Sequence, residues 1–198
     1  MTANVAIVNS GGANIASLIV ALKRLGQNAV LTTDPALLQS ASHVILPGVG
    51  AAQDAMQRLA DKHLVTCLQQ LTQPVLGICL GMQLLGEGSA EDNAKCLGLT
   101  TDHADLLKQD EHHAVPHMGW NQLVDVKTCP LLTDITAGSY FYFIHSYALP
   151  VSSTTQATCH YQTPFAAVIQ RDNFFGTQFH PERSAKAGRR LLSNFLAL

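Results

Sequence analysis

The sequence predicts an α/β fold, with an open and mostly parallel sheet flanked by helices and a more antiparallel C-terminal portion. In the first half, short β-branched runs alternate with longer amphipathic segments, a pattern typical of parallel strands joined by helical crossovers. In the second half, strand-like runs follow one another through turns, and no long helix is expected before Ser184. The 198 residues are about the size of one domain and contain no convincing linker, so we expect a single domain over residues 1–198.

The expected elements of the first half follow one another in alternating order. Breaks at Gly26–Asn28 and Asp34–Pro35 fall where turns and helix caps are expected. The apolar periodicity predicts strands at Val5–Val8, Ala29–Thr32, His43–Leu46 and Val75–Ile78, and helices from about Asn14 to Leu25 and through Ala51–Leu71.

The second half is expected to be richer in turns. The polar stretches Gly86–Lys95 and Gln109–Pro116 are expected to be loops. Ser184 can cap a last helix with one apolar face, formed by Leu191, Leu192, Phe195 and Leu196. Strands are expected at Gln122–Val126, Tyr140–Ile144, Gln156–His160, Ala166–Gln170 and Phe174–Phe179.

The composition excludes several classes of protein. Hydrophobic residues make up 47% of the chain, and charged residues make up 13%, below the roughly 25% of an average domain, so disorder is excluded. The net charge is −2 and no basic run occurs, which argues against binding to nucleic acid. The apolar stretch Ile15–Leu22 is too short to cross a membrane. No basic residue precedes it, so we expect no signal peptide and a location in the cytosol.

Neither the cysteines nor the histidines suggest a structural framework. The five cysteines are an odd number without a CxxC pair, so we expect no disulfide framework and no zinc site. A group of histidines lies in or next to an expected loop, where solvated side chains are a simpler explanation than a metal site; these are His103, His112, His113 and His117.

One motif indicates nucleophilic chemistry. The sequence GICLG at residues 77–81 follows an apolar strand and precedes a segment with helical character, which is the pattern of a nucleophile elbow with Cys79 in place of serine. The glycines allow a sharp turn, and the helix N-terminus favours the thiolate. The backbone N–H of Leu80 can donate to a developing oxyanion. The alternative is a buried cysteine packed between small residues.

A base and an orienting group are present in a second motif. His180 follows an apolar strand, and Pro181 favours an extended backbone at His180. In an extended chain residues i and i+2 point the same way, so Glu182 can accept from one ring nitrogen and leave the other facing the thiol. The alternative is a histidine at a strand end beside a solvated glutamate.

Two glycine-rich turns need separate interpretations. The sequence PGVG at residues 47–50 follows a strand at the edge where sites of parallel sheets form, so the backbone of Val49 and Gly50 can supply a second oxyanion donor. An ordinary tight turn is the alternative. The stretch 9–14 lacks the spacing of known phosphate-binding loops, so no nucleotide site is expected there.

These residues resemble class I glutamine amidotransferases, whose Cys-His-Glu triad matches Cys79, His180 and Glu182. The chain is most similar to the family of glutaminase subunits of imidazole glycerol phosphate synthases. The motifs that carry this resemblance span nearly the whole chain: PGVG (47–50), GICLGMQ (77–83), PHMGWN (116–121), YFIHSY (142–147) and HPERS (180–184).

The resemblance implies an enzyme of histidine biosynthesis that hydrolyses glutamine and passes ammonia through a tunnel to a separate (β/α)8-barrel cyclase subunit in a heterodimer. The cyclase makes imidazole glycerol phosphate and an aminoimidazole carboxamide ribonucleotide. The resemblance implies no metal and no organic cofactor. Residues implied to hold glutamine are Gln83, His145, Ser146 and Tyr147; those implied to face the partner are Asn14, Trp120, Tyr142 and Arg183.

Other interpretations remain open at this stage. The stretch 9–13 and Ala185 depart from the usual family pattern, and the first departure bears on the partner contacts. Trp120 can equally be a core aromatic and Tyr142 a strand residue within a packed sheet. A stand-alone thiol hydrolase of glutamyl substrates would use the same triad, and a catalytically silent binding module would retain only the fold. Glycine-flanked Val49 suggests that the oxyanion loop rearranges when the partner binds.

Overall fold

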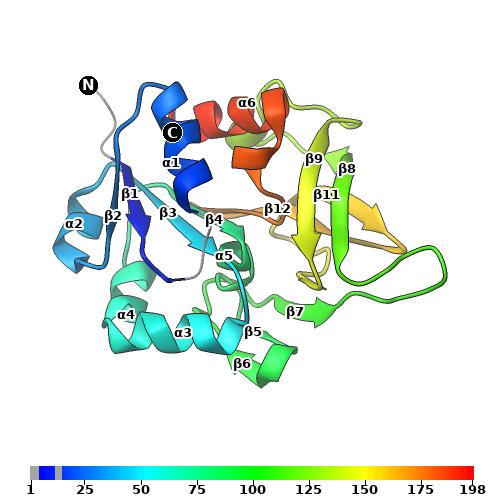
Figure 1. Cartoon of the computed structure of the whole chain (residues 1–198), viewed down its shortest axis with the longest axis horizontal. Helices are drawn as coiled ribbons and strands as arrows, with labels where there is room; N and C mark the ends of the chain where they lie inside the picture. Colours follow the sequence, from blue (N-terminus) through cyan, green and yellow to red (C-terminus); the bar gives the residue numbers. More distant parts are fainter. Residues whose placement is uncertain (1–4, 12–14) are drawn as a thin grey trace.

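A computed structural model describes residues 5–11 and 15–198 of the chain (Figure 1). Its main feature is a nine-stranded sheet in the order β2-β1-β3-β4-β13-β12-β11-β8-β9. The strands from β2 to β13 pair in parallel, and those from β13 to β9 pair antiparallel. The predicted fold class, a mostly parallel sheet with a more antiparallel C-terminal portion, is therefore confirmed.

Both faces of the parallel half are covered by helices. Val5 and Ile7 pack into a core with α1 (Ile15–Arg24) and α6 (Ala185–Phe195), whereas Ala6 and Val8 pack into a second core with α2 (Pro35–Ser40), α3 (Ala52–Asp61) and α4 (Leu64–Gln69). Figure 1 shows α1 and α6 on one side of the sheet and α3 and α4 on the other. Strands buried on two faces explain the continuous apolar runs. These strands are β1 (Val5–Val8), β3 (His43–Gly48), β4 (Val75–Cys79) and β13 (Phe174–Thr177). The edge strand β2 (Ala29–Thr32) exposes Val30 and Leu31.

The antiparallel half contains β12 (Thr163–Arg171), β11 (Thr155–Tyr161), β8 (His117–Val126) and β9 (Tyr140–His145). The strand expected from Gln122 begins five residues earlier, at His117, which pairs with His145 of β9. Exposed and buried side chains alternate along β8 without a continuous apolar run, which concealed its first half in the sequence.

A second sheet is built from very short strands. Its order is β10 (Tyr147–Ala148), β7 (His103–Leu106), β5 (Gly88–Ser89) and β6 (Ala94–Lys95). The expected loop Gly86–Lys95 therefore contains two strands and the 3-10 turn η1 (Glu91–Asn93), because two-residue strands leave no periodicity in a sequence. The expected loop Gln109–Pro116 contains no strand or helix, as predicted.

Several helix predictions need correction. The helix expected through Ala51–Leu71 is divided into α3 and α4 by His63, whose φ of 54° is left-handed. The six-residue α2 was not predicted, although the Asp34 side chain accepts a hydrogen bond from Ala36 N at 2.9 Å and caps it. The expected helix start at Asn14 lies outside the described residues. No helix in the described part of the chain is long and apolar enough to cross a membrane.

Ser184 precedes α6, but its side chain does not cap that helix. Its hydroxyl instead donates to His180 O at 2.6 Å and accepts from Tyr142 N at 2.9 Å. Ser184 thus connects the end of β13 to β9 rather than stabilising the helix end. A short 3-10 turn, η2 (Pro130–Leu132), also contacts α6.

Candidate active site

Cys79 occupies a strained turn between β4 and the short helix α5 (Leu80–Gln83). Its backbone angles, φ 54° and ψ −113°, are unusual for any residue except glycine. A Cβ atom on Gly77 would lie 2.5 Å from Gly81 O, and one on Gly81 would collide with Leu46 O. The glycines are therefore required for the close approach of β3, β4 and α5, as the sequence pattern indicated.

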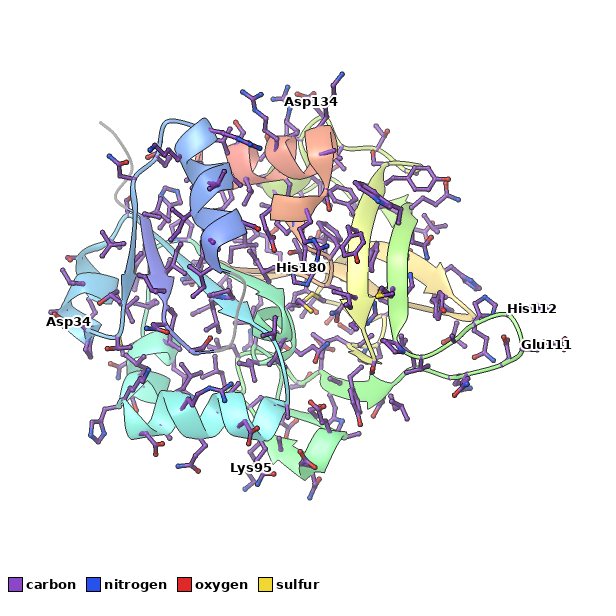
Figure 2. All side chains as sticks on the ribbon, viewed as in Figure 1. Asp34, Lys95, Glu111, His112, Asp134 and His180 are labelled. Carbon is purple, nitrogen blue, oxygen red and sulfur yellow. The ribbon has the colours of Figure 1, made fainter. Side chains whose placement is uncertain are left out.

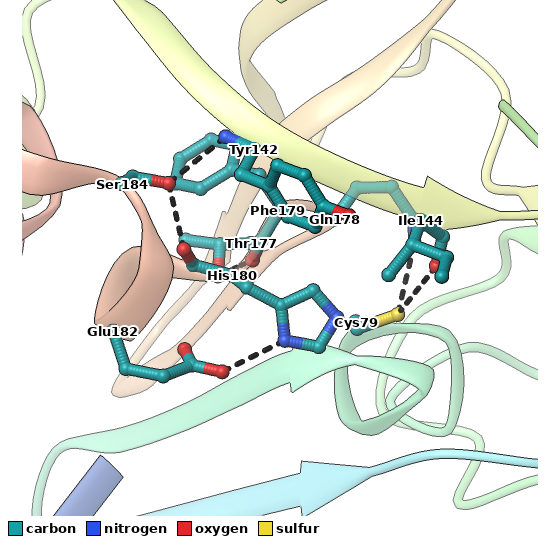
Figure 3. Close-up of polar contacts among 9 residues, drawn as sticks. All are labelled: Cys79, Tyr142, Ile144, Thr177, Gln178, Phe179, His180, Glu182 and Ser184. Carbon is teal, nitrogen blue, oxygen red and sulfur yellow. Dashed lines mark hydrogen bonds and ion pairs between the residues drawn. The ribbon is translucent and has the colours of Figure 1, made fainter. Parts of the chain in front are cut away.

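His180 and Glu182 lie beside the turn (Figure 3). His180 Nδ1 donates to Glu182 Oε1 at 2.8 Å. His180 follows β13 and its backbone N–H donates to Tyr142 O at 2.9 Å. The expected extended strand through Glu182 is wrong, because β13 ends at Thr177 and residues 181–183 form the 3-10 turn η3 (Pro181–Arg183). This turn, rather than strand alternation, brings Glu182 back beside the ring.

The other ring nitrogen of His180 points toward Cys79 (Figure 3). Among the described residues this buried Nε2 atom has no hydrogen-bond partner, and neither has Glu182 Oε2. Burial lowers the pKa of His180, but the interactions with Cys79 and Glu182 together outweigh it and raise this pKa to about 10. An imidazolium next to the sulfur favours the thiolate electrostatically.

The sulfur of Cys79 has two further neighbours. Its Sγ lies 3.6 Å from Ile144 O and 3.7 Å from Gln178 Nε2. Neither residue was identified from the sequence. Gln178 precedes His180 by two positions, so an extended chain would direct both side chains the same way, and this spacing was an available signal.

A cavity of about 510 Å³ opens at the sulfur. It is lined by the expected triad residues and by all of the residues expected to hold glutamine or an oxyanion: Cys79, His180, Glu182, Val49, Gly50, Leu80, Gln83, His145, Ser146 and Tyr147. Glu91 also lines it and was missed, because the turn that carries it has no motif. Its Oε2 accepts from Ala52 N at 2.9 Å.

The segment PGVG, residues 47–50, lies beside Cys79 and is anchored at Pro47 and, two residues beyond its end, at Ala52. Gly48 pairs with Cys79 at the end of β3. On the near side, the buried Ser10 hydroxyl donates to Pro47 O at 2.9 Å. On the far side, the bond between Glu91 and Ala52 N fixes the start of α3. The intervening Gly50 has a φ of +87°, which glycine tolerates readily.

Two buried histidines contact each other at the cavity: His145 lines it, and His117 does not. His145 Nδ1 donates to Tyr147 O at 2.9 Å, and its Nε2 lies 3.0 Å from His117 Nδ1. Burial, with smaller contributions from nearby histidines, lowers the pKa of His145 to about 3 and that of His117 to about 4, so both are neutral. The expectation that His117 is solvated is therefore wrong.

The remaining histidines of that group fit the expectation better. His112 lies at the tip of an extended loop together with Glu111, far from the interior position of His180 (Figure 2). His103 is exposed and His113 half-buried, each hydrogen-bonded to a neighbouring aspartate. Among residues 5–11 and 15–198, no group of three or more His, Cys, Asp or Glu side chains is arranged to hold a metal ion.

The residues expected to face a partner lie beside the cavity rather than deep within it. Trp120 of β8 pairs with Tyr142 of β9, and the Arg183 guanidinium carbon lies 4.3 Å from the centre of the Tyr142 ring. Trp120 is 53% exposed, so the alternative of a core aromatic is wrong. Arg183 also lines the cavity. Asn14 lies outside the described residues.

Comparison with known proteins assigns the chain to a protein family. Residues 6–198 match the model of the family "Glutamine amidotransferase class-I". The chain belongs to this family. A crystal structure of a glutamine amidotransferase superposes with a TM-score of 0.75 and covers 98% of this chain and 97% of that chain; at 16% identity it shows the fold alone.

Among curated proteins, the similarity is much higher and extends over the full length. Imidazole glycerol phosphate synthase subunit HisH 2 of Legionella pneumophila subsp. pneumophila (strain Philadelphia 1) is 50% identical over 194 residues, covering 98% of each chain. Imidazole glycerol phosphate synthase subunit HisH of Vibrio cholerae serotype O1 is 46% identical over 204 residues, covering 100% of each chain.

Proposed function

We propose that the chain, as a single domain over residues 1–198, is the glutaminase subunit of an imidazole glycerol phosphate synthase. One observation carries the proposal: Cys79, His180 and Glu182 line one cavity, with the His180–Glu182 bond at 2.8 Å. Membership of the amidotransferase family and the names of the most similar relatives support the same function. The reaction is hydrolysis of the side-chain amide of glutamine to glutamate and ammonia.

In this proposal Cys79 is the nucleophile and His180 the acid and base. The thiolate sulfur attacks the amide carbon, and the carbon–nitrogen bond breaks as His180 Nε2 donates a proton to the departing ammonia. Water then loses a proton to His180 and cleaves the thioester, which releases glutamate and restores the sulfur. Glu182 orients the ring through Nδ1 and stabilises its charged form.

Backbone donors stabilise the oxyanion of each tetrahedral intermediate. The Leu80 N–H at the start of α5 is one donor, and the 47–50 segment supplies a second from Val49 or Gly50. Both lie beside Cys79 because β3 and β4 end together at this edge of the sheet. Their contribution depends on the position of the 47–50 segment, which Ser10 and Glu91 anchor at Pro47 and Ala52.

The polar groups of the cavity match the two ends of glutamine. Glu91 is a carboxylate that does not belong to the triad, and it can accept from the α-ammonium group. Residues 145–147 also line the cavity, and their backbone N–H groups can donate to the α-carboxylate. The Gln83 NH₂ group already donates to Tyr147 O and Gln178 Oε1, so its remaining Oε1 atom can accept a hydrogen bond from the substrate. This assignment places the side-chain amide of the substrate at Cys79.

The outer face of the β8–β9 pair is the proposed docking surface for a (β/α)8-barrel cyclase subunit. Met118, Trp120 and Ile144 expose apolar side chains there, with 65%, 53% and 36% of their surfaces accessible. The strands pair Met118 with Ile144 and Trp120 with Tyr142, so the exposed side chains adjoin one another. Arg183 connects this face to the cavity, which gives ammonia a short route toward the partner.

The test is release of ammonia and glutamate from free glutamine by the purified chain, alone and with the candidate cyclase and its ribonucleotide ligand. We expect activity that the liganded partner strongly stimulates. Cys79→Ala should abolish it, whereas Cys129→Ala, which alters another buried cysteine, should retain it. Peptide cleavage without deamination of free glutamine would favour the stand-alone thiol hydrolase. Failure of Cys79 to react with a glutamine-analogue electrophile would favour the silent binding module.

A further inference from the structure

Gln178 is a buried side chain to which the proposed mechanism gives no role. It has no accessible surface and directly follows β13. It contacts Gln83 on one side and Cys79 on the other, and Figure 3 shows it near the sulfur. Its two amide atoms make different contacts: Oε1 lies 3.0 Å from Gln83 Nε2, and Nε2 lies 3.7 Å from Cys79 Sγ. A buried amide that contacts a reacting sulfur is placed to influence its charge.

The orientation of this amide follows from a backbone carbonyl. Tyr147 O can only accept, so the Gln83 group that lies 2.7 Å from it is the NH₂ group. The same NH₂ group faces Gln178, which must therefore present its oxygen to Gln83. The Gln178 NH₂ group is left to face the sulfur of Cys79.

The neighbouring histidine strengthens this assignment. His145 Nδ1 also donates to Tyr147 O, at 2.9 Å, so that carbonyl accepts two hydrogen bonds and has no capacity for a third. Rotation of either glutamine amide would place two donors or two acceptors against each other. The Gln178 donor is thus fixed toward the sulfur by contacts distant from it.

We propose that Gln178 is a catalytic residue that donates an N–H to the Cys79 sulfur and stabilises its thiolate form. This inference rests on the proposed role of Cys79 as nucleophile. In the activation step the sulfur gives its proton to His180 Nε2, and the negative charge left on the sulfur then accepts from both the imidazolium and the Gln178 amide. Ile144 O has the opposite preference, because it can only accept from a thiol.

The titratable and charged groups around the sulfur are few. His180 faces it directly, Glu182 lies behind His180, and neutral His145 lies close enough to interact with His180. Glu91 and Arg183 line the same cavity. Gln178 differs from all of these groups because it carries no charge at any pH. Its replacement by methionine therefore changes the stability of the thiolate without adding a titrating group.

A second cysteine and glutamine pair provides a matched control within the chain. Cys129 Sγ donates to Gln170 Oε1 at 3.2 Å, and Gln170 Nε2 lies 3.5 Å from Asp172 O. Here the amide presents its oxygen to the sulfur, which favours the protonated thiol, and burial raises the pKa of Cys129 as well. The two pairs thus present opposite ends of the same side chain to sulfur.

The experiment is the pH profile of alkylation by iodoacetamide, followed at the Cys79 peptide by mass spectrometry. We compare the wild type with Gln178→Met, Gln178→Glu and the control Gln170→Met. We expect the midpoint of the profile to rise by about one pH unit in Gln178→Met, because the N–H donor to the thiolate is lost. It should rise further in Gln178→Glu, because a carboxylate would then face the thiolate and repel it. Gln170→Met should leave it unchanged.

Three outcomes would overturn the proposal. These are unchanged midpoints in both folded Gln178 variants, an equal shift in Gln170→Met, or loss of folding in both Gln178 variants, which would assign Gln178 to the fold. If only the methionine variant fails to fold, the glutamate variant decides, because it keeps the shape of glutamine. Alkylation needs no glutamine, so a wild type without glutaminase activity would refute the proposed function and leave this comparison intact.

Discussion

The two halves of the main sheet hold their parts of the site by different physical means. The parallel half presents Cys79 through steric fit: Gly77 and Gly81 let β3, β4 and α5 approach so closely that no Cβ could be added. On the side of the antiparallel half, His180 is held by hydrogen bonds: it donates to Tyr142 O and Glu182 Oε1 and accepts from the Ser184 hydroxyl. β13 joins the halves, since it is parallel to β4 and antiparallel to β12.

This difference between the two halves indicates which substitutions should affect activity without affecting stability. A substitution at the close-packed glycines of the parallel half disturbs the backbone, so stability and activity should fall together. A substitution among the hydrogen-bonding residues removes a side-chain contact and leaves the strands in place, so activity should fall while the fold remains.

The largest effect is expected from Gly81→Ala. The new Cβ would collide with Leu46 O, so we expect a destabilisation of at least about 3 kcal/mol together with loss of glutaminase activity. Denaturant unfolding measures the first and ammonia release the second. Gly26→Ala is the control: Gly26 has a φ of +78° with open space around its Cα, so only about 1 kcal/mol should be lost. Equal costs at the two sites would refute the steric account.

Among the residues held by hydrogen bonds, His180→Asn should lower the glutaminase rate by about 10²- to 10⁴-fold, because the group that acts as acid and base is removed. Little folded protein should be lost. Ammonia release and circular dichroism would measure the two effects. His160→Asn, at an exposed position of β11, should behave as the wild type. An unchanged burst of ammonia from His180→Asn would show that another group is the base.

The same substitution should alter how stability depends on pH. The folded-state pKa of His180 is raised to about 10 from 6.5, so the folded protein binds its proton more tightly than the unfolded chain. The resulting stabilisation is complete below pH about 6.5 and is lost as the pH rises toward about 10. Urea unfolding of the wild type and His180→Asn at several pH values checks this, and parallel profiles would contradict it.

A smaller effect on activity is expected at the 47–50 segment, within the parallel half. Ser10→Ala removes the hydroxyl bond to Pro47 O, so we expect the catalytic rate to fall by about tenfold, the stability by about 1 kcal/mol, and KM to change little. Ser10→Thr should retain activity. Ser40→Ala, which removes a hydroxyl bond to Leu37 O on the distant α2, is the control. An effect on KM alone would assign Ser10 to substrate binding.

The smallest effect on the isolated chain is expected from Trp120→Ala. Because Trp120 is exposed on β8, its removal should leave unpartnered glutaminase activity and stability unchanged while it weakens binding of the cyclase by about tenfold or more. Isothermal calorimetry with the candidate partner measures this. Val30→Ala, on the exposed face of β2 at the opposite edge of the sheet, should not change the affinity. Unaltered binding by Trp120→Ala would remove this face from the interface.

The sequence predicted those features that depend on local spacing. The parallel strands, the sharp turn at Cys79 and the proximity of Glu182 to His180 all follow from short motifs, although a 3-10 turn replaced the expected strand at Glu182. The residues that were missed become functional only through distant contacts. Gln178 meets Gln83 across 95 positions of sequence, and Ser10 meets Pro47 across 37. Such distant contacts leave no periodic signal in the chain, and the two-residue spacing between Gln178 and His180 was the one local signal for Gln178.

The strained backbone of Cys79 has a consequence for how the site is prepared. Its φ of 54° and ψ of −113° cost about 1–3 kcal/mol, which the packing of the surrounding sheet must offset. Folding alone therefore places the buried Cys79 sulfur at the cavity before any ligand arrives. A substrate or a partner then has nothing to organise at Cys79 itself, and its binding energy is free to act on the neighbouring 47–50 segment.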